Sequence, residues 1–254
     1  PFAAKVYAYL IYKQLPFEIV YVHPVRPDAV AFTGKRIIPV LKIGEEWRSD
    51  STPIGVWLDQ LFPERPILGV SAAEREAILE ADRWVTGSLI PAAFRQTVEW
   101  DSLNNGIRNG FALARALHRS GGLEWYYRWS WPWLVPRAGF VRRIVRRASR
   151  KGESMTEYWR RLFHEFEALL AGGPFLGGHQ QPTLADLSAF PQFETPRALN
   201  VRSDLDLKPP LALAKWLGRM RKQFATDPLL INCTANRVGP ATTPAAPDNP
   251  PPSP

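Results

Sequence analysis

The sequence predicts a small α/β unit followed by an all-helical part. Two observations predict this order: short apolar and β-branched runs alternate with turns before residue 63, and helical periodicity replaces them after residue 70. The 254 residues allow about two domains, and 45% apolar with 22% charged residues is typical of a folded protein with a substantial core. This composition excludes a fibrous or wholly disordered chain.

The first unit, residues 1–63, is predicted to have the order α-β-β-β-α. Its first helix carries an apolar face and stops at Leu15-Pro16, and the tight turn Gly44-Glu45 separates two of its strands. We expect helices over 1–14 and 53–62, and strands over 17–22, 37–43 and 46–48.

The second unit, residues 70–235, is predicted to consist of long helices with a basic aromatic insert at 121–151. We expect helices over 71–88, 91–100 (its continuation after a kink), 104–118, 156–171, from Thr183 onward, and over 211–224. Pro191 is expected to kink or end the helix that Thr183 opens. Residues 240–254 contain seven prolines and no apolar period, so 236–254 is predicted to be a disordered tail.

The cysteine and histidine content of the sequence argues against disulfide bonds and against a metal site. The lone cysteine, Cys233, excludes a disulfide scaffold and a multi-cysteine metal site, and it fits a reducing compartment. His23, His118, His164 and His179 show no metal-ligand spacing, so no metal is predicted. No run approaches the ~20 apolar residues that a membrane-spanning helix needs.

A proline interrupts the apolar run 37–43. Proline lacks a backbone N–H, and strand interiors normally exclude it. Two interpretations stay open for Pro39: an ordinary edge-strand proline, or a cis peptide at Ile38-Pro39 that turns the Ile38 backbone outward as an open edge for an extended ligand.

Asp50 and Ser51 stand at the start of the next predicted helix. Such residues usually cap the helix. In the alternative, Asp50 meets an ammonium group, while Ser51 and the free helix N–H groups bind a carboxylate. A γ-glutamyl group carries both charges, and the hairpin from Pro39 to Asp50 brings the two features to the same edge.

Thr183 and Asp186 resemble a capping box in which Asp replaces the usual Glu or Gln. The expected role is structural, because such a cap starts an apolar helix and contributes about 1 kcal/mol.

Most of the net charge of +8 lies in the insert 121–151. Eight basic residues and one acid give this segment +7, and 24 basic and 23 acidic residues remain elsewhere. Six aromatic residues fall between Trp125 and Trp133, and arginines then oppose apolar residues at helical spacing from Phe140 to Arg150. Two interpretations stay open: contact with an anionic membrane surface, or a solvated helix whose aromatic side chains pack on the helical part. No recognised nucleic-acid motif accompanies the charge, which disfavours nucleic acid.

The motifs IIPVL, SDS, FLGG and PTLADL resemble the glutathione S-transferase superfamily. A narrower resemblance is to the glutathione-transferase-like branch of membrane-associated prostaglandin E synthase type 2. It rests on PFAAKVYAYL, LPFEIVYVHPVR, KRIIPVL, SDST, ADRWVTGSLIPAAFR and GGPFLGGHQQPTLADL, within residues 1 to 195. The resemblance implies a thioredoxin-like N-terminal domain with the glutathione site and an all-α C-terminal domain that completes the pocket.

The resemblance also implies roles for particular residues. Glutathione is expected at the Ile38 backbone before Pro39 and at the Asp50-Ser51 pair. The reactive group is expected in the residue before Pro1, which the sequence does not contain, so no catalytic residue is named. A helix N-terminus there would stabilise a thiolate. Because a strand precedes this helix in the related fold, we expect the sequence to be a piece of a longer protein.

The expected function is that of a cytoplasmic glutathione transferase-like enzyme. It conjugates, reduces or isomerises a hydrophobic electrophile with glutathione as co-substrate, forms a homodimer, and associates with membranes through 121–151. The alternative is a non-catalytic adaptor of the same fold that docks to membrane surfaces. Ala3 favours the adaptor, because it stands where the branch has the second cysteine of a dithiol mechanism.

Overall fold

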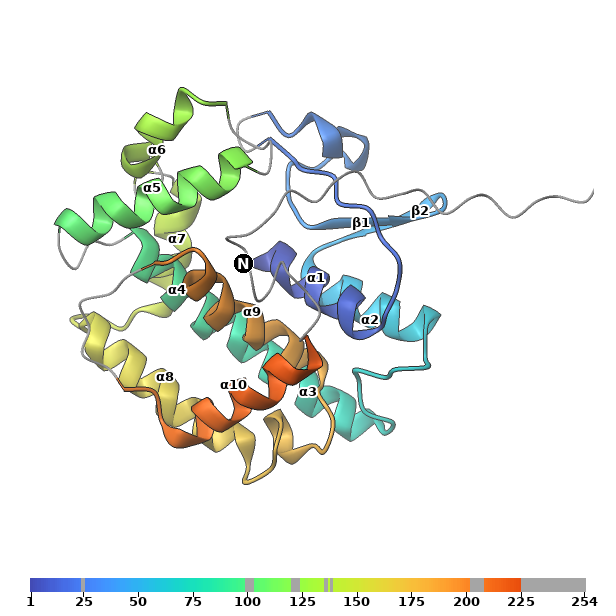
Figure 1. Ribbon diagram of the computed structural model, residues 1–254. Coiled ribbons are helices and arrows are strands. Elements are labelled where there is room, and N and C mark those ends of the chain that lie inside the picture. The colour runs from blue at the N-terminus through green and yellow to red at the C-terminus, as the bar shows by residue number, and fades with distance from the viewer. Residues whose placement is uncertain are drawn as a thin grey trace, which may run out of the picture.

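The computed structural model describes residues 1–23, 26–98, 103–119, 124–134, 137, 139–201 and 208–224. Cys233 and the predicted tail 236–254 lie outside the described residues. The N-terminal part contains α1 (Phe2–Tyr12), η1 (Asp28–Thr33), β1 (Val40–Ile43), β2 (Glu46–Ser49) and α2 (Ser51–Leu61). The helical part contains α3 (Ala72–Trp84), η2 (Val85–Leu89), α4 (Ile90–Val98), α5 (Leu103–Arg119), α6 (Tyr127–Leu134), α7 (Gly139–Ala148), α8 (Met155–Leu170), η4 (Leu176–Gly178), α9 (Leu184–Ala198) and α10 (Leu211–Gln223). This arrangement confirms the predicted thioredoxin-like unit with a small sheet followed by an all-helical domain (Figure 1).

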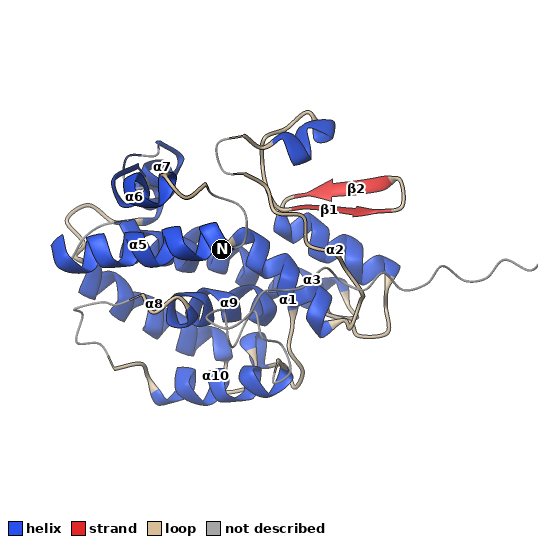
Figure 2. Cartoon of the chain, turned by 45° about the horizontal axis from the view of Figure 1, so that its top comes forward, coloured by secondary structure: helices blue, strands red, loops and turns tan. Residues whose placement is uncertain are grey.

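The described sheet has two antiparallel strands, β1 and β2, which pair Val40 with Ser49 and Ile43 with Glu46. The hairpin lies over α2, away from most of the helical part (Figure 2). The predicted strand 17–22 is wrong: this segment is coil between α1 and η1. A strand needs a hydrogen-bonded partner as well as β propensity. In the described sheet β1 and β2 pair only with each other, and Val20 is 66% exposed.

Most predicted helices are confirmed within a few residues. The kink predicted between residues 88 and 91 is the π-helical turn η2, which joins α3 to α4 without a break in the backbone. The expectation for Pro191 is wrong, because α9 continues through it to Ala198. Every residue of α9 from Leu184 to Gln192 is buried, so packing on all sides outweighs the helix-breaking cost of about 3 kcal/mol.

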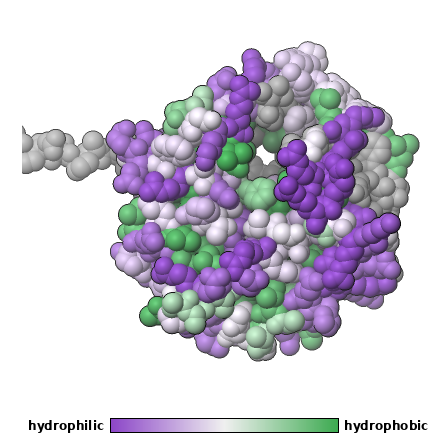
Figure 3. All heavy atoms as spheres, turned by 180° about the vertical axis from the view of Figure 1, so that it is seen from behind, coloured by the Kyte–Doolittle hydropathy of each residue, from purple (hydrophilic) through white to green (hydrophobic). Residues whose placement is uncertain are grey.

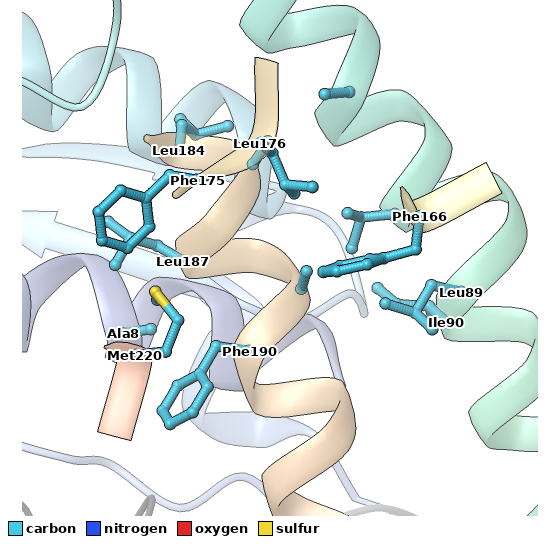
Figure 4. Close-up of a cluster of buried hydrophobic side chains, with 14 of the residues drawn as sticks. Ala8, Leu89, Ile90, Phe166, Phe175, Leu176, Leu184, Leu187, Phe190 and Met220 are labelled. Carbon is cyan, nitrogen blue, oxygen red and sulfur yellow. The ribbon is translucent and has the colours of Figure 1, made fainter. Parts of the chain in front are cut away.

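Helix α9 lies at the centre of the hydrophobic core (Figure 4). One continuous cluster of buried side chains joins α1 and α2 of the N-terminal part to the helical part. Leu187 and Phe190 point from α9 toward the side on which Phe175, Ala8 and Met220 lie (Figure 4). The two parts of the chain therefore share one core.

A capping box begins α9. The N–H and the hydroxyl of Thr183 donate to Asp186 Oδ2 at 2.9 and 2.8 Å. The other carboxylate oxygen of Asp186 accepts from the N–H of Leu176 at 3.0 Å and from Trp216 Nε1 at 2.7 Å. Burial raises the pKa of Asp186 although these four donors act against it. Asp186 thus ties the start of α9 to η4 and α10.

A buried lysine connects the two parts of the molecule. Lys5 of α1 is 0% exposed, and its Nζ lies 2.8 Å from Asp82 Oδ1 of α3. Lys5 also donates to the hydroxyl of Thr86 at 3.0 Å. The hydroxyls of Thr52, in α2, and Ser188, in α9, both donate to Asp82.

Tyr9 completes this cluster, which we call the Lys5–Asp82 network. Because Ser188 donates to Asp82, the Tyr9 hydroxyl donates to Ser188 Oγ, at 2.6 Å. Burial, followed by the charge of Asp82, raises the pKa of Tyr9 well above its usual value. The network joins α1, α2, α3, η2 and α9 through the buried Lys5, Tyr9, Asp82 and Ser188 and the partly buried Thr52 and Thr86.

We predict that breaking the Lys5–Asp82 pair destabilises the protein strongly. Lys5→Met and Asp82→Asn should each lower the free energy of unfolding by about 3–5 kcal/mol, because each leaves a buried partner uncompensated. The double variant should lose less than the sum of the two, which urea unfolding measures. The control is Arg83→Gln next to Asp82, which removes two exposed ion pairs, with Glu76 and Glu80, and should have little effect. Additive losses in the double variant would contradict a coupled pair.

Candidate functional site

The candidate site lies where the β1–β2 hairpin meets the start of α2. The Ile38-Pro39 peptide bond is cis. Pro39 is buried, whereas Ile37 and Ile38 are about half exposed. Among the described residues, no group pairs with the backbone N–H or carbonyl of Ile38. The main chain of Ile38 is therefore available to a ligand at the edge of the hairpin.

Asp50 lies beside this edge in an uncommon backbone conformation. Its φ is 74° and its ψ is 137°, a region that costs about 1–3 kcal/mol for a residue with a side chain. Two backbone hydrogen bonds hold Asp50 in this conformation. Its N–H donates to the carbonyl oxygen of Pro39 at 3.2 Å, and its carbonyl oxygen accepts from the N–H of Ile54 at 3.1 Å.

The side chain of Asp50 is not used as a cap. Asp50 occupies the N-cap position of α2, but its carboxylate makes no capping hydrogen bond and the residue is exposed. The capping interpretation of Asp50 is therefore wrong, because the positive φ turns this residue out of the usual capping geometry. The carboxylate faces solvent next to Ile38 and Pro39.

Ser51, the first residue of α2, is buried but unsatisfied. It is 1% exposed, and its Oγ has no hydrogen-bond partner among the described residues. Buried hydroxyls are normally paired, so an orphaned one calls for an explanation. It stands at the N-terminus of an 11-residue helix whose first turn contains no acidic residue. The free N–H groups and the helix dipole there favour an anion.

The next residue, Thr52, belongs to the Lys5–Asp82 network. Its hydroxyl accepts from Lys5 Nζ at 3.4 Å and donates to Asp82. The start of α2 is thus anchored to the helical part by Thr52, while the hydroxyl of Ser51 beside it meets no partner within the described parts of the chain. This anchor was not predicted from the sequence. The available signal was the position of Lys5, a charged residue four positions before Tyr9 on the apolar face of α1.

A second link joins the N-terminal part to the helical part at the α5–α6 connection. His23 Nε2 lies 2.6 Å from Glu124 Oε2, and Arg26 pairs with the other oxygen of Glu124. Since the Arg26 N–H donates to His23 Nδ1 at 3.0 Å, the Nε2 atom carries the proton and donates to Glu124. The His23 hydrogen bond lowers the pKa of Glu124.

The molecule is hollowed between its two parts. The space-filling view shows an opening in the upper half of the molecule (Figure 3), and the ribbon places the start of α1 on one side of this region and α5 on the other (Figure 1). The N-terminus of the chain, at the start of α1, lies beside this region (Figure 1). Within the described parts of the chain, no three His, Cys, Asp or Glu side chains gather as a metal site.

The comparisons with known proteins agree with this geometry. Residues 1–66 match the family of the glutathione S-transferase N-terminal domain. A glutathione S-transferase from Rhodospirillum rubrum has a TM-score of 0.58 at 17% identity, over 93% of this chain and 89% of that chain. The chain has the glutathione S-transferase fold. No curated protein matches it.

Two further structures with the glutathione S-transferase fold carry isomerase names. A bacterial maleyl pyruvate isomerase of the zeta class has a TM-score of 0.53 at 19% identity, over 87% of each chain. A maleylacetoacetate isomerase from Anaeromyxobacter dehalogenans, solved with dicarboxyethyl glutathione and citrate in its active site, has a TM-score of 0.50 at 20% identity, over 87% of this chain and 81% of that chain. Together with the family match over residues 1–66, the shared fold supports the glutathione S-transferase superfamily. These findings lend no support to the prostaglandin E synthase branch.

We predict that Ser51→Ala leaves the free energy of unfolding unchanged or raises it by about 1 kcal/mol, because it removes an unpaired buried hydroxyl. Thr52→Val is the matched control and should lower it by about 1–3 kcal/mol, since Asp82 loses a donor. Urea unfolding of the two variants measures both values. A marked loss of stability in Ser51→Ala would show that this hydroxyl has a structural partner.

Proposed function

We propose that the chain binds glutathione at the edge formed by Ile38, Pro39, Asp50 and Ser51, and uses it to conjugate, reduce or isomerise a hydrophobic electrophile. The observation that carries the proposal is the orphaned Ser51 hydroxyl at the N-terminus of α2. A stable fold gains nothing from such a group, whereas a carboxylate ligand would satisfy it.

The two ends of a γ-glutamyl group fit two adjacent features of this edge. Its carboxylate would accept hydrogen bonds from Ser51 and from the first N–H groups of α2. Its ammonium would meet the exposed carboxylate of Asp50. The peptide part of glutathione would then run along the open main chain of Ile38, as an added strand does at a sheet edge.

The thiol would project toward the start of α1 and the opening that α5 borders. A helix N-terminus stabilises a thiolate, which is the nucleophilic form. The helical part would supply the apolar surroundings of the second substrate. Conjugation and isomerisation are both represented among the structural neighbours, as transferases and isomerases by name. The prostaglandin E synthase branch and homodimer formation stay predictions and do not enter this proposal.

The second candidate function is a non-catalytic adaptor with the same fold, which Ala3 favours. A dithiol mechanism needs a second cysteine in the first turn of α1, and this sequence has Ala3 at the corresponding position. A single reactive group just before Pro1 would still allow conjugation and isomerisation. The two candidates differ in turnover rather than in glutathione binding.

We predict that glutathione binding depends on the side chains that would bind the two charged groups of its γ-glutamyl part, Ser51 and Asp50. Ser51→Ala and Asp50→Asn should each weaken the affinity about 10- to 100-fold, because hydrogen bonds to charged groups contribute about 1.5–3 kcal/mol. Isothermal titration calorimetry measures the dissociation constants. The control, Glu64→Gln, removes an exposed carboxylate between α2 and α3 and should bind as the unmodified chain does. Unchanged affinity in both site variants would remove the proposed site.

We expect turnover to separate the enzyme from the adaptor. A chain that includes the residue before Pro1 is incubated with glutathione and an aromatic halide, and thioether formation is followed by absorbance. A rate that falls in parallel with affinity in Ser51→Ala is the expected result. Tight glutathione binding with no turnover of halide, disulfide or isomerisable substrates would favour the adaptor.

A further inference from the structure

The helices α6 and α7 form an exposed surface with an uncommon composition. We call it the tryptophan–arginine surface and define it by these exposed residues: Trp125, Tyr126, Trp129, Trp133, Leu134, Arg142, Arg143, Arg146 and Arg147. The two helices follow each other in the chain; α6 packs on α5, and α7 packs on α4 (Figure 1). Neither the core nor the proposed glutathione site uses these side chains.

The packing of α7 turns its arginines outward. Val141 and Val145 are 1% and 6% exposed and pack against Phe94 of α4. Because these residues occupy the inner face of the helix, the arginine pairs that follow each of them project to solvent. The apolar face of α7 is therefore occupied, and this helix cannot insert into another apolar phase.

Three arginines of this surface, Arg143, Arg146 and Arg147, differ from other arginines among the described residues in their lack of a carboxylate partner. Elsewhere, Arg161 pairs with Glu153 and Arg221 pairs with the buried Glu194. In the described part of the chain, no carboxylate forms an ion pair with Arg143, Arg146 or Arg147. A patch of like charges raises the electrostatic energy of the fold, so a partner with negative charge would stabilise it.

The aromatic side chains of α6 are held at the surface rather than left loose. A Cβ at Gly110 of α5 would lie 2.6 Å from Pro132, so the two helices are in close backbone contact. Phe111 packs edge-on against Trp129, with the ring centroids 5.8 Å apart. Even so, Trp125 and Trp129 are 66% and 59% exposed. Large apolar side chains clustered at a surface mark an interaction site.

We propose that the tryptophan–arginine surface docks the protein on an anionic lipid bilayer. Arginines bind lipid phosphates, and tryptophan rings prefer the level of the headgroups, so the two residue types together match this interface. Binding is peripheral, since no helix among the described residues is long and apolar enough to cross a bilayer. This proposal does not depend on glutathione binding.

The arrangement of the rings favours lipid over single-stranded nucleic acid. Stacking on bases requires ring faces that stand apart. Here Trp125 contacts Tyr126 edge-on, with centroids 6.0 Å apart, and Tyr126 lies 4.8 Å from Tyr127. Trp125, Tyr126 and Tyr127 thus form one contiguous group of rings rather than separate platforms.

The test is co-sedimentation of the full chain with vesicles at low salt. Vesicles of phosphatidylcholine mixed with phosphatidylserine should retain the protein, and vesicles of phosphatidylcholine alone should not. The triple variant Arg143→Gln/Arg146→Gln/Arg147→Gln should bind anionic vesicles about 100-fold more weakly, because each arginine near the surface contributes about 1 kcal/mol. The matched control, Arg75→Gln/Arg160→Gln/Lys222→Gln, removes the same charge from exposed positions outside the surface and should retain binding.

A second measurement tests the aromatic half of the surface. Brominated lipid in the anionic vesicles should quench tryptophan fluorescence, and Trp125→Phe/Trp133→Phe should lose much of the quenching. Circular dichroism shows that each variant is folded. Equal binding of the two triple variants, or no binding of the unmodified chain, would overturn the proposal. Binding to single-stranded RNA but not to anionic vesicles would overturn it in favour of a nucleic acid.

Discussion

The docking of the N-terminal part on the helical part depends on the buried ion pair between Lys5 and Asp82. A lysine removed from water is tolerated only when a carboxylate and further hydrogen-bonding groups surround it. Here the acid is on α3, and the additional hydroxyls come from α2, η2 and α9. The pair can therefore form only when the N-terminal part and the helical part are docked together. Hydrophobic burial supplies most of the stability, but it is not directional, and this network specifies how the two parts face each other.

The Lys5–Asp82 network also fixes part of the geometry of the candidate site. Thr52 fixes the first turn of α2, and the bond from Asp50 to Pro39 fixes the end of the hairpin against it. Between these two fixed points, Ser51 keeps an unpaired hydroxyl and Asp50 keeps a positive φ. Both features cost free energy in the folded protein. Three neighbouring residues thus have different roles. Thr52 stabilises the interface between the two parts, whereas Asp50 and Ser51 are held in an arrangement that suits a ligand.

The local features of the chain were predictable from sequence, and the features that depend on distant partners were not. Caps and periodicity gave α8 and α10 nearly to the residue, and Pro39 with Asp50 marked the edge of the hairpin. The segment 17–22 has strong β propensity, but a strand also needs a neighbour, which local sequence does not reveal. Pro191 was judged by its own backbone chemistry, whereas burial on all sides of α9 decided the outcome. Lys5 was overlooked because its partner lies 77 positions away in the chain.

The arginines of the protein show why the surface on α6 and α7 stands apart from the rest. Arg161 and Arg221 each hold a carboxylate that the fold has largely or wholly buried, so their charge is part of the structure. The arginines of α7 are on a helix whose inner face is already packed against α4, and in the described part of the chain Arg143, Arg146 and Arg147 form no ion pair with a carboxylate. The proximity of their charges to one another is unfavourable in the isolated molecule. A negatively charged surface outside the protein would offset this repulsion, and it would also account for the exposed tryptophans that precede α7 in the chain.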